Sequence, residues 1–250
     1  YKATDVCGNS ATATQTITVY DNTPPVITVP PSLTVTCASD VPAVNINAVS
    51  ATDNCSGNVV ITHVSDVIVN QSCVNKFTVQ RTYMATDACG NSSTGVQIIN
   101  VNDNIPPVII APPSVTGIQC GGEIPPHYNS ASEFIAAGGS LSDNCTGNGN
   151  IVTLTFVSES ITPGNCPNSY IVTRVYKATD ACGNTSTAQH VINVSDTTPP
   201  AITAPAPVTV VCASDVPAPN ISLVTVSDNC SNNNEVTVVF VNDVIYNQEC

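Results

Sequence analysis

The sequence predicts an all-β protein built from tandem, disulfide-stapled β-sandwich repeats. Three observations support this fold class. The motif Ala-Thr-Asp-Xaa-Cys-Gly-Asn occurs three times, at residues 3–9, 85–91 and 178–184, and such self-similarity is the signature of a repeat architecture. The 12 cysteines fall in a regular register along the chain. Only 9% of the residues are charged and there is no Trp, whereas the abundant Val, Ile and Thr favour strands over helices.

The repeats align on shared landmarks. A Pro-Pro pair begins at residues 24, 106 and 199, and an Asp-Asn-Cys sequence ends at residues 55, 145 and 230. The second repeat has an insertion near 128–140, which we expect to be a loop. The alignment predicts that the chain is an excerpt of a longer array with four parts: 1–20, the C-terminal piece of a preceding repeat; 21–102, the complete first repeat; 103–195, the complete second repeat; and 196–250, the N-terminal part of a third repeat.

Within the first repeat, apolar residues alternate with polar ones at the period of a β-strand. Residues 26–29 and 33–36 are expected to form the opening strands, residues 59–64 and 67–70 a hairpin that turns at Ser65-Asp66, residues 77–85 a long strand, and residues 96–101 the last strand. About seven short strands with frequent turn signals predict an immunoglobulin-like sandwich. The Pro-Pro junctions restrict the backbone, so we expect consecutive repeats to form an elongated, semi-rigid rod.

The cysteines indicate an oxidising, extracellular setting, because cytosolic thiols stay reduced. Zinc is the rival explanation, but no cysteine pair has the close spacing of a zinc site, and the three His residues share no repeat position. The predicted hairpin at Ser65-Asp66 would bring its two flanking cysteines together, and a bridge needs Cα atoms within about 7 Å. The predicted pairs are Cys55–Cys73, Cys37–Cys89, Cys145–Cys166, Cys120–Cys182 and Cys230–Cys250.

A formal net charge of −13 argues against nucleic acid or an anionic membrane as a partner. No stretch approaches the ~20 apolar residues of a membrane span. We therefore expect no membrane insertion in this segment, and the cysteines lead us to expect an extracellular, cell-surface location.

Acidic residues recur at equivalent positions and allow two interpretations. Carboxylates at the junctions and in the turn motif could bind calcium, which prefers several oxygen ligands. Alternatively, Asp and Asn make Asx turns here, with glycine supplying the left-handed backbone. The second interpretation is favoured, because no cluster has the dense alternation of a dedicated calcium loop. No cofactor is required; the candidate calcium ligands are Asp21, Asp87, Asp103, Asp180 and Asp196.

The two arginines of the chain hold the same register in two repeats, and each precedes a tyrosine by two residues. We expect structural ion pairs between Arg81 and Asp66 and between Arg174 and Glu159. Tyr83 and Tyr176 are expected to anchor the strand as a tyrosine corner does.

Several segments together resemble a known family: Asp-Asn-Thr-Pro-Pro-Val-Ile (21–27), Thr-Val-Thr-Cys (34–37), Ala-Thr-Asp-Asn-Cys (51–55) and Tyr-Met-Ala-Thr-Asp-Ala-Cys-Gly-Asn (83–91). They are similar to the HYR-like, hyalin-repeat-related domain in its four-cysteine form, as found in giant secreted adhesins of Bacteroidota, including gliding-motility adhesins exported by type IX secretion. The resemblance implies an immunoglobulin-like fold and a stalk or adhesion role. Hyalin repeats proper place a Cys in the final strand, where residues 93–101 have none, so their cystine pattern is not transferred.

No catalytic constellation is visible, since there is no G-x-S-x-G and no His recurs between repeats. We therefore expect that this chain is not an enzyme. The leading hypothesis is a structural stalk or filament segment that presents a distal adhesive region. The alternatives are a module whose loops, above all the insertion, bind glycans or surface ligands, and a self-assembling filament subunit. The corresponding partners are neighbouring repeats of the same chain, other filament chains, and surface glycans or substrata.

Overall fold

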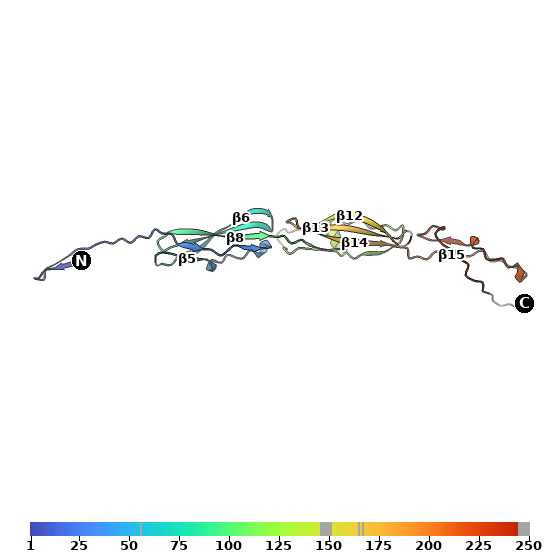
Figure 1. The fold of residues 1–250 in the computed structure, drawn as a ribbon, viewed down its shortest axis with the longest axis horizontal. Coiled ribbons are helices and arrows are strands. Elements are labelled where there is room, and N and C mark those ends of the chain that lie inside the picture. Colours follow the sequence, from blue (N-terminus) through green and yellow to red (C-terminus); the bar gives the residue numbers. More distant parts are fainter. Residues whose placement is uncertain (56, 146–151, 165, 167, 245–250) are drawn as a thin grey trace. The chain divides into compact units, whose positions relative to one another are not determined.

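The computed structural model describes residues 1–55, 57–145, 152–164, 166 and 168–244. The chain divides into two compact units, one containing Tyr1–Asn104 and one that begins at Ile105 (Figure 1). Each unit is considered by itself below. Almost all regular elements are strands, as the composition predicts.

The first unit begins with a small hairpin and continues into a sandwich. Strands β1 (Lys2–Thr4) and β2 (Ser10–Thr12) pair across the first copy of the repeated motif. The larger sheet has the order β4-β8-β7-β6, and a second sheet pairs β3 with β5. The bounds are β3 (Val26–Thr28), β4 (Leu33–Val35), β5 (Ser50–Thr52), β6 (Val60–Cys73), β7 (Lys76–Thr86) and β8 (Ser92–Asn102), with 3-10 turns at Ala38–Asp40 and Ile46–Ala48.

The core of the first unit lies on one face of β7 and β8. Alternate residues of β7 are buried, as expected for a strand with one face toward a core. Phe77 and Val79 of β7 pack with Ile99 and Val101 of β8. The same inward face carries Arg81 and Tyr83, which is 1% exposed, so a charged side chain enters an otherwise apolar layer.

The second unit repeats this architecture. Its larger sheet has the order β10-β14-β13-β12, and β9 pairs with β11 as β3 pairs with β5. A further pair, β15 and β16, belongs to the third repeat. The bounds are β9 (Val108–Ile110), β10 (Val115–Ile118), α1 (Ala131–Ala136), β11 (Ser140–Ser142), β12 (Thr153–Pro163), β13 (Tyr170–Thr179), β14 (Thr185–Val194), β15 (Ala201–Thr203) and β16 (Thr225–Ser227), with 3-10 turns at Ala213–Asp215 and Ile221–Leu223.

The predicted hairpin at Ser65-Asp66 is wrong. Strand β6 runs without a break through these residues, and Asp66 lies opposite Arg81 in the ladder with β7. The register shifts between His63 and Ser65, which is how a bulge absorbs one extra residue without turning the strand. The chain reverses instead between Cys73 and Lys76.

The insertion in the second repeat is not a simple loop, because it contains helix α1. The Ser130 side chain accepts a hydrogen bond from the Glu133 backbone N–H at 3.2 Å, and the Glu133 carboxylate accepts one from the Asn129 N–H at 2.8 Å. This arrangement resembles a capping box, whose Ser-x-x-Glu signature is present in the sequence. Phe134 of the helix is fully buried.

Candidate functional site

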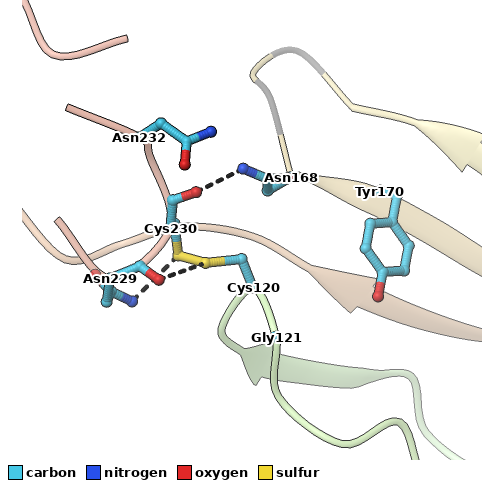
Figure 2. Close-up of a pocket in the computed structure, with 7 residues that line it drawn as sticks. All are labelled: Cys120, Gly121, Asn168, Tyr170, Asn229, Cys230 and Asn232. Atoms are coloured by element: carbon cyan, nitrogen blue, oxygen red, sulfur yellow. Dashed lines mark hydrogen bonds between the residues drawn. A yellow bond between two sulfur atoms is a disulfide. The ribbon is translucent and has the colours of Figure 1, made fainter. Parts of the chain in front are cut away.

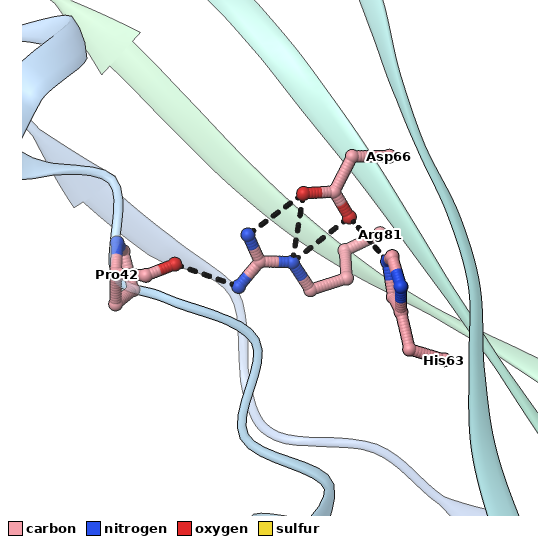
Figure 3. Close-up of polar contacts among 4 residues, drawn as sticks. All are labelled: Pro42, His63, Asp66 and Arg81. Carbon is pink, nitrogen blue, oxygen red and sulfur yellow. Dashed lines mark hydrogen bonds and ion pairs between the residues drawn. The ribbon is translucent and has the colours of Figure 1, made fainter.

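The predicted ion pair of the first repeat is the centre of a polar network (Figure 3). The Arg81 guanidinium donates from Nε and Nη2 to the Asp66 carboxylate at 2.8–3.1 Å, and from Nη1 to the Pro42 carbonyl at 2.8 Å. His63 Nε2 lies 2.9 Å from Asp66 Oδ1, the oxygen that also accepts a hydrogen bond from Arg81 Nε. The Arg81 hydrogen bond lowers the pKa of Asp66 below its usual value, and a fork-shaped donor such as Arg fixes the carboxylate geometry.

The second predicted pair is also present, in a different setting. Arg174 Nε donates to Glu159 at 2.7 Å, and the two residues face each other across β12 and β13. Ring-bearing side chains surround Tyr176 on this face, with Phe134 centred 5.3 Å from it and Phe156 5.8 Å from it. The Tyr128 N–H donates to the Tyr176 hydroxyl at 3.2 Å. The insertion therefore packs onto the sheet of its own repeat.

The repeated Asp of the turn motif has a structural role in each copy. Asp87 accepts hydrogen bonds from the backbone N–H groups of Cys89 and Asn91 at 2.9 and 2.8 Å, and from the Asn91 side chain at 2.8 Å. Asp5 and Asp180 make the equivalent bonds. The following Gly90 has φ +93°, a value that favours glycine. These carboxylates therefore hold Asx turns.

Two of the junction aspartates lie close to acidic residues and cysteines that were not among the predicted calcium ligands. Ligand atoms of Asp21, Asp53 and Cys55 lie within 4.8 Å of one another, as do those of Asp196, Asp228 and Cys230. The sequence showed Asp53 and Asp228 as repeated residues, but sequence distance concealed their proximity to the junction. Asp103, the corresponding junction residue of the second repeat, is buried, and its N–H donates to the Asn75 carbonyl at 2.9 Å.

These two clusters fit calcium incompletely. Each combines carboxylates from two residues with a cysteine sulfur, whereas calcium takes six to eight oxygen ligands. One oxygen of Asp21 already accepts the Thr23 N–H at 3.0 Å, and one oxygen of Asp53 accepts the Cys55 N–H at 2.9 Å. The second oxygen of Asp53 is buried and has no hydrogen-bond partner, so a cation at this cluster would satisfy it.

The cysteines are paired differently from the prediction. Cys55, Cys89 and Cys166 carry free thiols, and Cys120 is bonded to Cys230 with a Cα–Cα distance of 5.4 Å. Each predicted pair includes one of these five residues, so none of them matches the structure; they were Cys55–Cys73, Cys37–Cys89, Cys145–Cys166, Cys120–Cys182 and Cys230–Cys250. Cys250 lies outside the described residues. Disulfide bonds are also formed by Cys37, Cys73, Cys145 and Cys182.

The misplaced hairpin explains the wrong pairing. Because β6 is one strand whose two ends pair with Thr86 and Lys76, the ends of β7, its own ends are separated by the length of β7, roughly 33 Å at ~3.3 Å per residue. Cys55 precedes this strand and Cys73 ends it, so they lie at opposite ends of the sheet. The Ala38 N–H donates to the Asn75 side chain at 3.0 Å, which brings the segment after Cys37 to the end of the sheet where Cys73 lies.

The Cys120–Cys230 bond joins the second and third repeats within the second unit (Figure 2). The surrounding pocket, about 340 Å³ in volume, is lined by Gly121, Asn168, Tyr170 and Asn229. Asn168 donates from its side chain to the Cys230 carbonyl. The sequence register did not predict this link, because it aligns Cys120 and Cys230 with cysteines at different positions of one repeat.

Comparison with solved structures gives distant similarities to cadherin ectodomains. They are a protocadherin gammaB7 EC3-6 cis-dimer (15% identity, TM-score 0.29, 73% of this chain and 54% of that chain), protocadherin Gamma B2 extracellular cadherin domains 1–5 (14%, 0.29, 70% and 41%) and the protocadherin GammaB4 extracellular domain (15%, 0.28, 73% and 35%). This chain thus spans about half or less of their lengths. None of the curated proteins compared with the chain matches it.

One family model matches part of the chain. Residues 25–101 match the HYR-like domain with 4 cysteines. The matched segment falls within the predicted first repeat and contains Cys37, Cys55, Cys73 and Cys89. No helix in the described part of the chain is long and apolar enough to cross a membrane. Residues 25–101 are therefore similar to HYR-like four-cysteine repeats and adopt an all-β, immunoglobulin-like fold.

Proposed function

We propose that this chain is a stalk segment of a large extracellular adhesion protein, in which non-catalytic repeats space and present a distal adhesive region. The observation that carries the proposal is the packing of the second-repeat insertion. Its Phe134 is fully buried and contacts Tyr176 of the same repeat. The largest elaboration of the array thus contributes to the core, where a ligand-binding loop would present its large side chains to solvent.

The other repeated side chains support the same role. The turn aspartates accept backbone hydrogen bonds, the arginines pair with acids on the adjacent strand, and six of the described cysteines are disulfide-bonded. Disulfides favour an extracellular location. The landmark residues and the match at 25–101 favour a parent protein similar to the giant surface adhesins of Bacteroidota, in which neighbouring repeats of the chain are the main partners.

Binding assays with the whole chain test this function. We expect no saturable binding to immobilised glycans or bacterial and abiotic surfaces. The variant Ile135→Asp provides the sharpest comparison, because Ile135 lies next to Phe134 on α1 but is 51% exposed. Saturable binding by the native chain that Ile135→Asp abolishes, with unchanged circular dichroism, would establish the loop-mediated binding module instead.

One observation favours a filament as the second candidate function. Strand β6 is a long edge strand of its sheet and exposes Val60, Val64, Val67 and Ile68. Unprotected edge strands pair readily with other chains. Sedimentation over a hundredfold range of concentration tests it: a monomer throughout supports the stalk, whereas association that Val67→Lys prevents supports a filament subunit.

A further inference from the structure

Two free thiols face one pocket at one end of the first unit. Cys55 follows β5, and Cys89 lies in the turn between β7 and β8; both are exposed. The two residues line a pocket of about 50 Å³ together with Asp21, Asp53 and Asp87. Neither cysteine belongs to a disulfide in the structure.

The strand register explains why they meet. Val60 at the start of β6 lies opposite Thr86 at the end of β7, so the residues just before Val60 and just after Thr86 share one end of the sheet. Cys73 lies opposite Lys76 at the other end of β7, roughly 33 Å away at ~3.3 Å per residue. A disulfide requires Cα atoms within about 7 Å. Cys89 is therefore the cysteine of the first repeat that Cys55 can reach.

The second repeat provides an independent observation. Cys145 and Cys182 occupy the positions that correspond to Cys55 and Cys89, after β11 and between β13 and β14. Both are disulfide-bonded. Equivalent positions in two copies of one fold thus hold thiols in the first repeat and oxidised cysteines in the second.

We propose that Cys55 and Cys89 form a disulfide that closes the first repeat at the end opposite Cys73. A low-molecular-mass disulfide such as oxidised glutathione supplies the oxidising equivalents. One protein thiolate attacks a sulfur of this reagent and releases one small thiol, and the second protein thiolate then displaces the other small thiol from the mixed disulfide. Two protein thiols and one small disulfide thereby become one protein disulfide and two small thiols.

Closure changes both the backbone and the pocket. The bond ties the segment before β6 to the β7–β8 turn and encloses residues 55–89, which restricts the unfolded chain. It also replaces the Cys55 thiol, whose pKa is raised by the neighbouring Asp21 side chain, with a disulfide that does not titrate. The carboxylates of Asp21 and Asp53 then line the pocket beside a disulfide instead of two thiols.

Peptide mapping of the full chain tests the bond directly. The chain is equilibrated with a mixture of reduced and oxidised glutathione, its remaining thiols are alkylated, and it is digested without reduction. We expect a cross-linked peptide that contains Cys55 and Cys89. Complete alkylation of both residues, or a link from Cys55 to Cys7 or to a second chain, would overturn the proposal.

Serine variants distinguish the stabilising effect of the disulfide bond from that of local side-chain packing. In the oxidised chain, Cys55→Ser, Cys89→Ser and the double variant should each lower the melting temperature of the first repeat by the same amount, on the order of 15 °C. Cys7→Ser is the matched control, because Cys7 occupies the corresponding turn of the exposed β1–β2 hairpin, and it should leave the melting temperature unchanged. Additive losses in the double variant would contradict a shared covalent bond.

Discussion

The first and second repeats build the same sheet but cover its inner face differently. In the first repeat, Tyr83 has His63 at its edge, with ring centroids 6.0 Å apart, and the neighbouring Arg81 donates to the Pro42 carbonyl. In the second repeat, Phe156 takes the place of His63, and the insertion adds Phe134. A chain with few aromatic residues thus completes one core with a polar network and the other with a cluster of rings.

Removing the ring that the insertion supplies should have the largest effect. Phe134→Ala leaves a cavity beside Tyr176 and should destabilise the second repeat by about 3–5 kcal/mol. Hydrogen exchange of β13, followed by mass spectrometry during urea unfolding, measures this loss without interference from the first repeat. Ile135→Ala on the same helix is the control and should cost under about 0.5 kcal/mol, since Ile135 is half exposed. Equal effects of the two substitutions would mean that the cluster does not stabilise the sheet.

The polar network of the first repeat should contribute less. The Arg81 side chain is 5% exposed but that of Asp66 is 33% exposed, so water can solvate the acid when its partner is removed. Arg81→Met should cost about 1–3 kcal/mol. A double-mutant cycle with Asp66→Asn, read from hydrogen exchange of β7, should give a coupling energy of about 1 kcal/mol. Strictly additive losses would show that the two side chains act independently.

The sequence predicted the sheets more successfully than the connections between them. Period-two alternation identified β7 and β8, and the shared register of Arg81 and Arg174 predicted both acid partners. It failed at Ser65-Asp66, because these polar residues favour turns and a bulge within a strand has the same local composition. Because of that single error, the prediction placed Cys55 and Cys73 at the same end of the sheet, whereas they lie at opposite ends. The proximity of Asp53 to Asp21 depends on how β3 pairs with β5, which no local pattern encodes.

The stabilities of the two repeats should also depend differently on pH, and this effect is smaller. His190 of β14 faces Arg174 on β13 and contacts the Pro113 carbonyl at 3.2 Å, as Gln97 contacts Pro31 in the first repeat. Burial lowers the pKa of His190 below its usual value of 6.5. The unfolded chain therefore binds this proton more readily, and the contribution of His190 to stability is lost as the pH falls below about 6.5.

Paired substitutions isolate this effect from the other titrating groups. His190→Gln should reduce the difference in β13 protection between pH 7.5 and pH 5.0, by on the order of 1 kcal/mol or less. Gln97→His should introduce a similar dependence into β7 of the first repeat. If His190→Gln leaves the pH dependence of β13 unchanged, His190 does not titrate as its burial requires.

The two repeats also differ in their disulfide bonds, and here we expect a substitution to change which cysteines pair more than it changes stability. Cys73 of the first repeat is disulfide-bonded, whereas the corresponding Cys166 is a free, exposed thiol. Cys166 lies two residues from Asn168, whose side chain contacts Cys230. In Cys230→Ser, refolded with a glutathione mixture, we expect Cys120 to pair with Cys166, and peptide mapping detects the link. A persistent free thiol at Cys120 would show that the second repeat cannot adopt the first-repeat connection.

Calcium should have the smallest effect, because the carboxylates at the candidate positions already have backbone partners. Asp87 and Asp180 hold the turns of their motifs, and one oxygen of Asp21 accepts the Thr23 N–H. A site with a dissociation constant near 1 mM, typical of weak extracellular modules, would add about 1.4 kcal/mol at 10 mM calcium by mass action. We expect no such stabilisation, and therefore no rise in the melting temperature of the oxidised chain, compared with a sodium chloride control of equal ionic strength.

The unpartnered oxygen of Asp53 is the atom most able to contradict this expectation. A calcium-dependent rise that Asp53→Asn removes would assign the Asp21–Asp53 cluster to calcium, while the turn aspartates would keep their structural role.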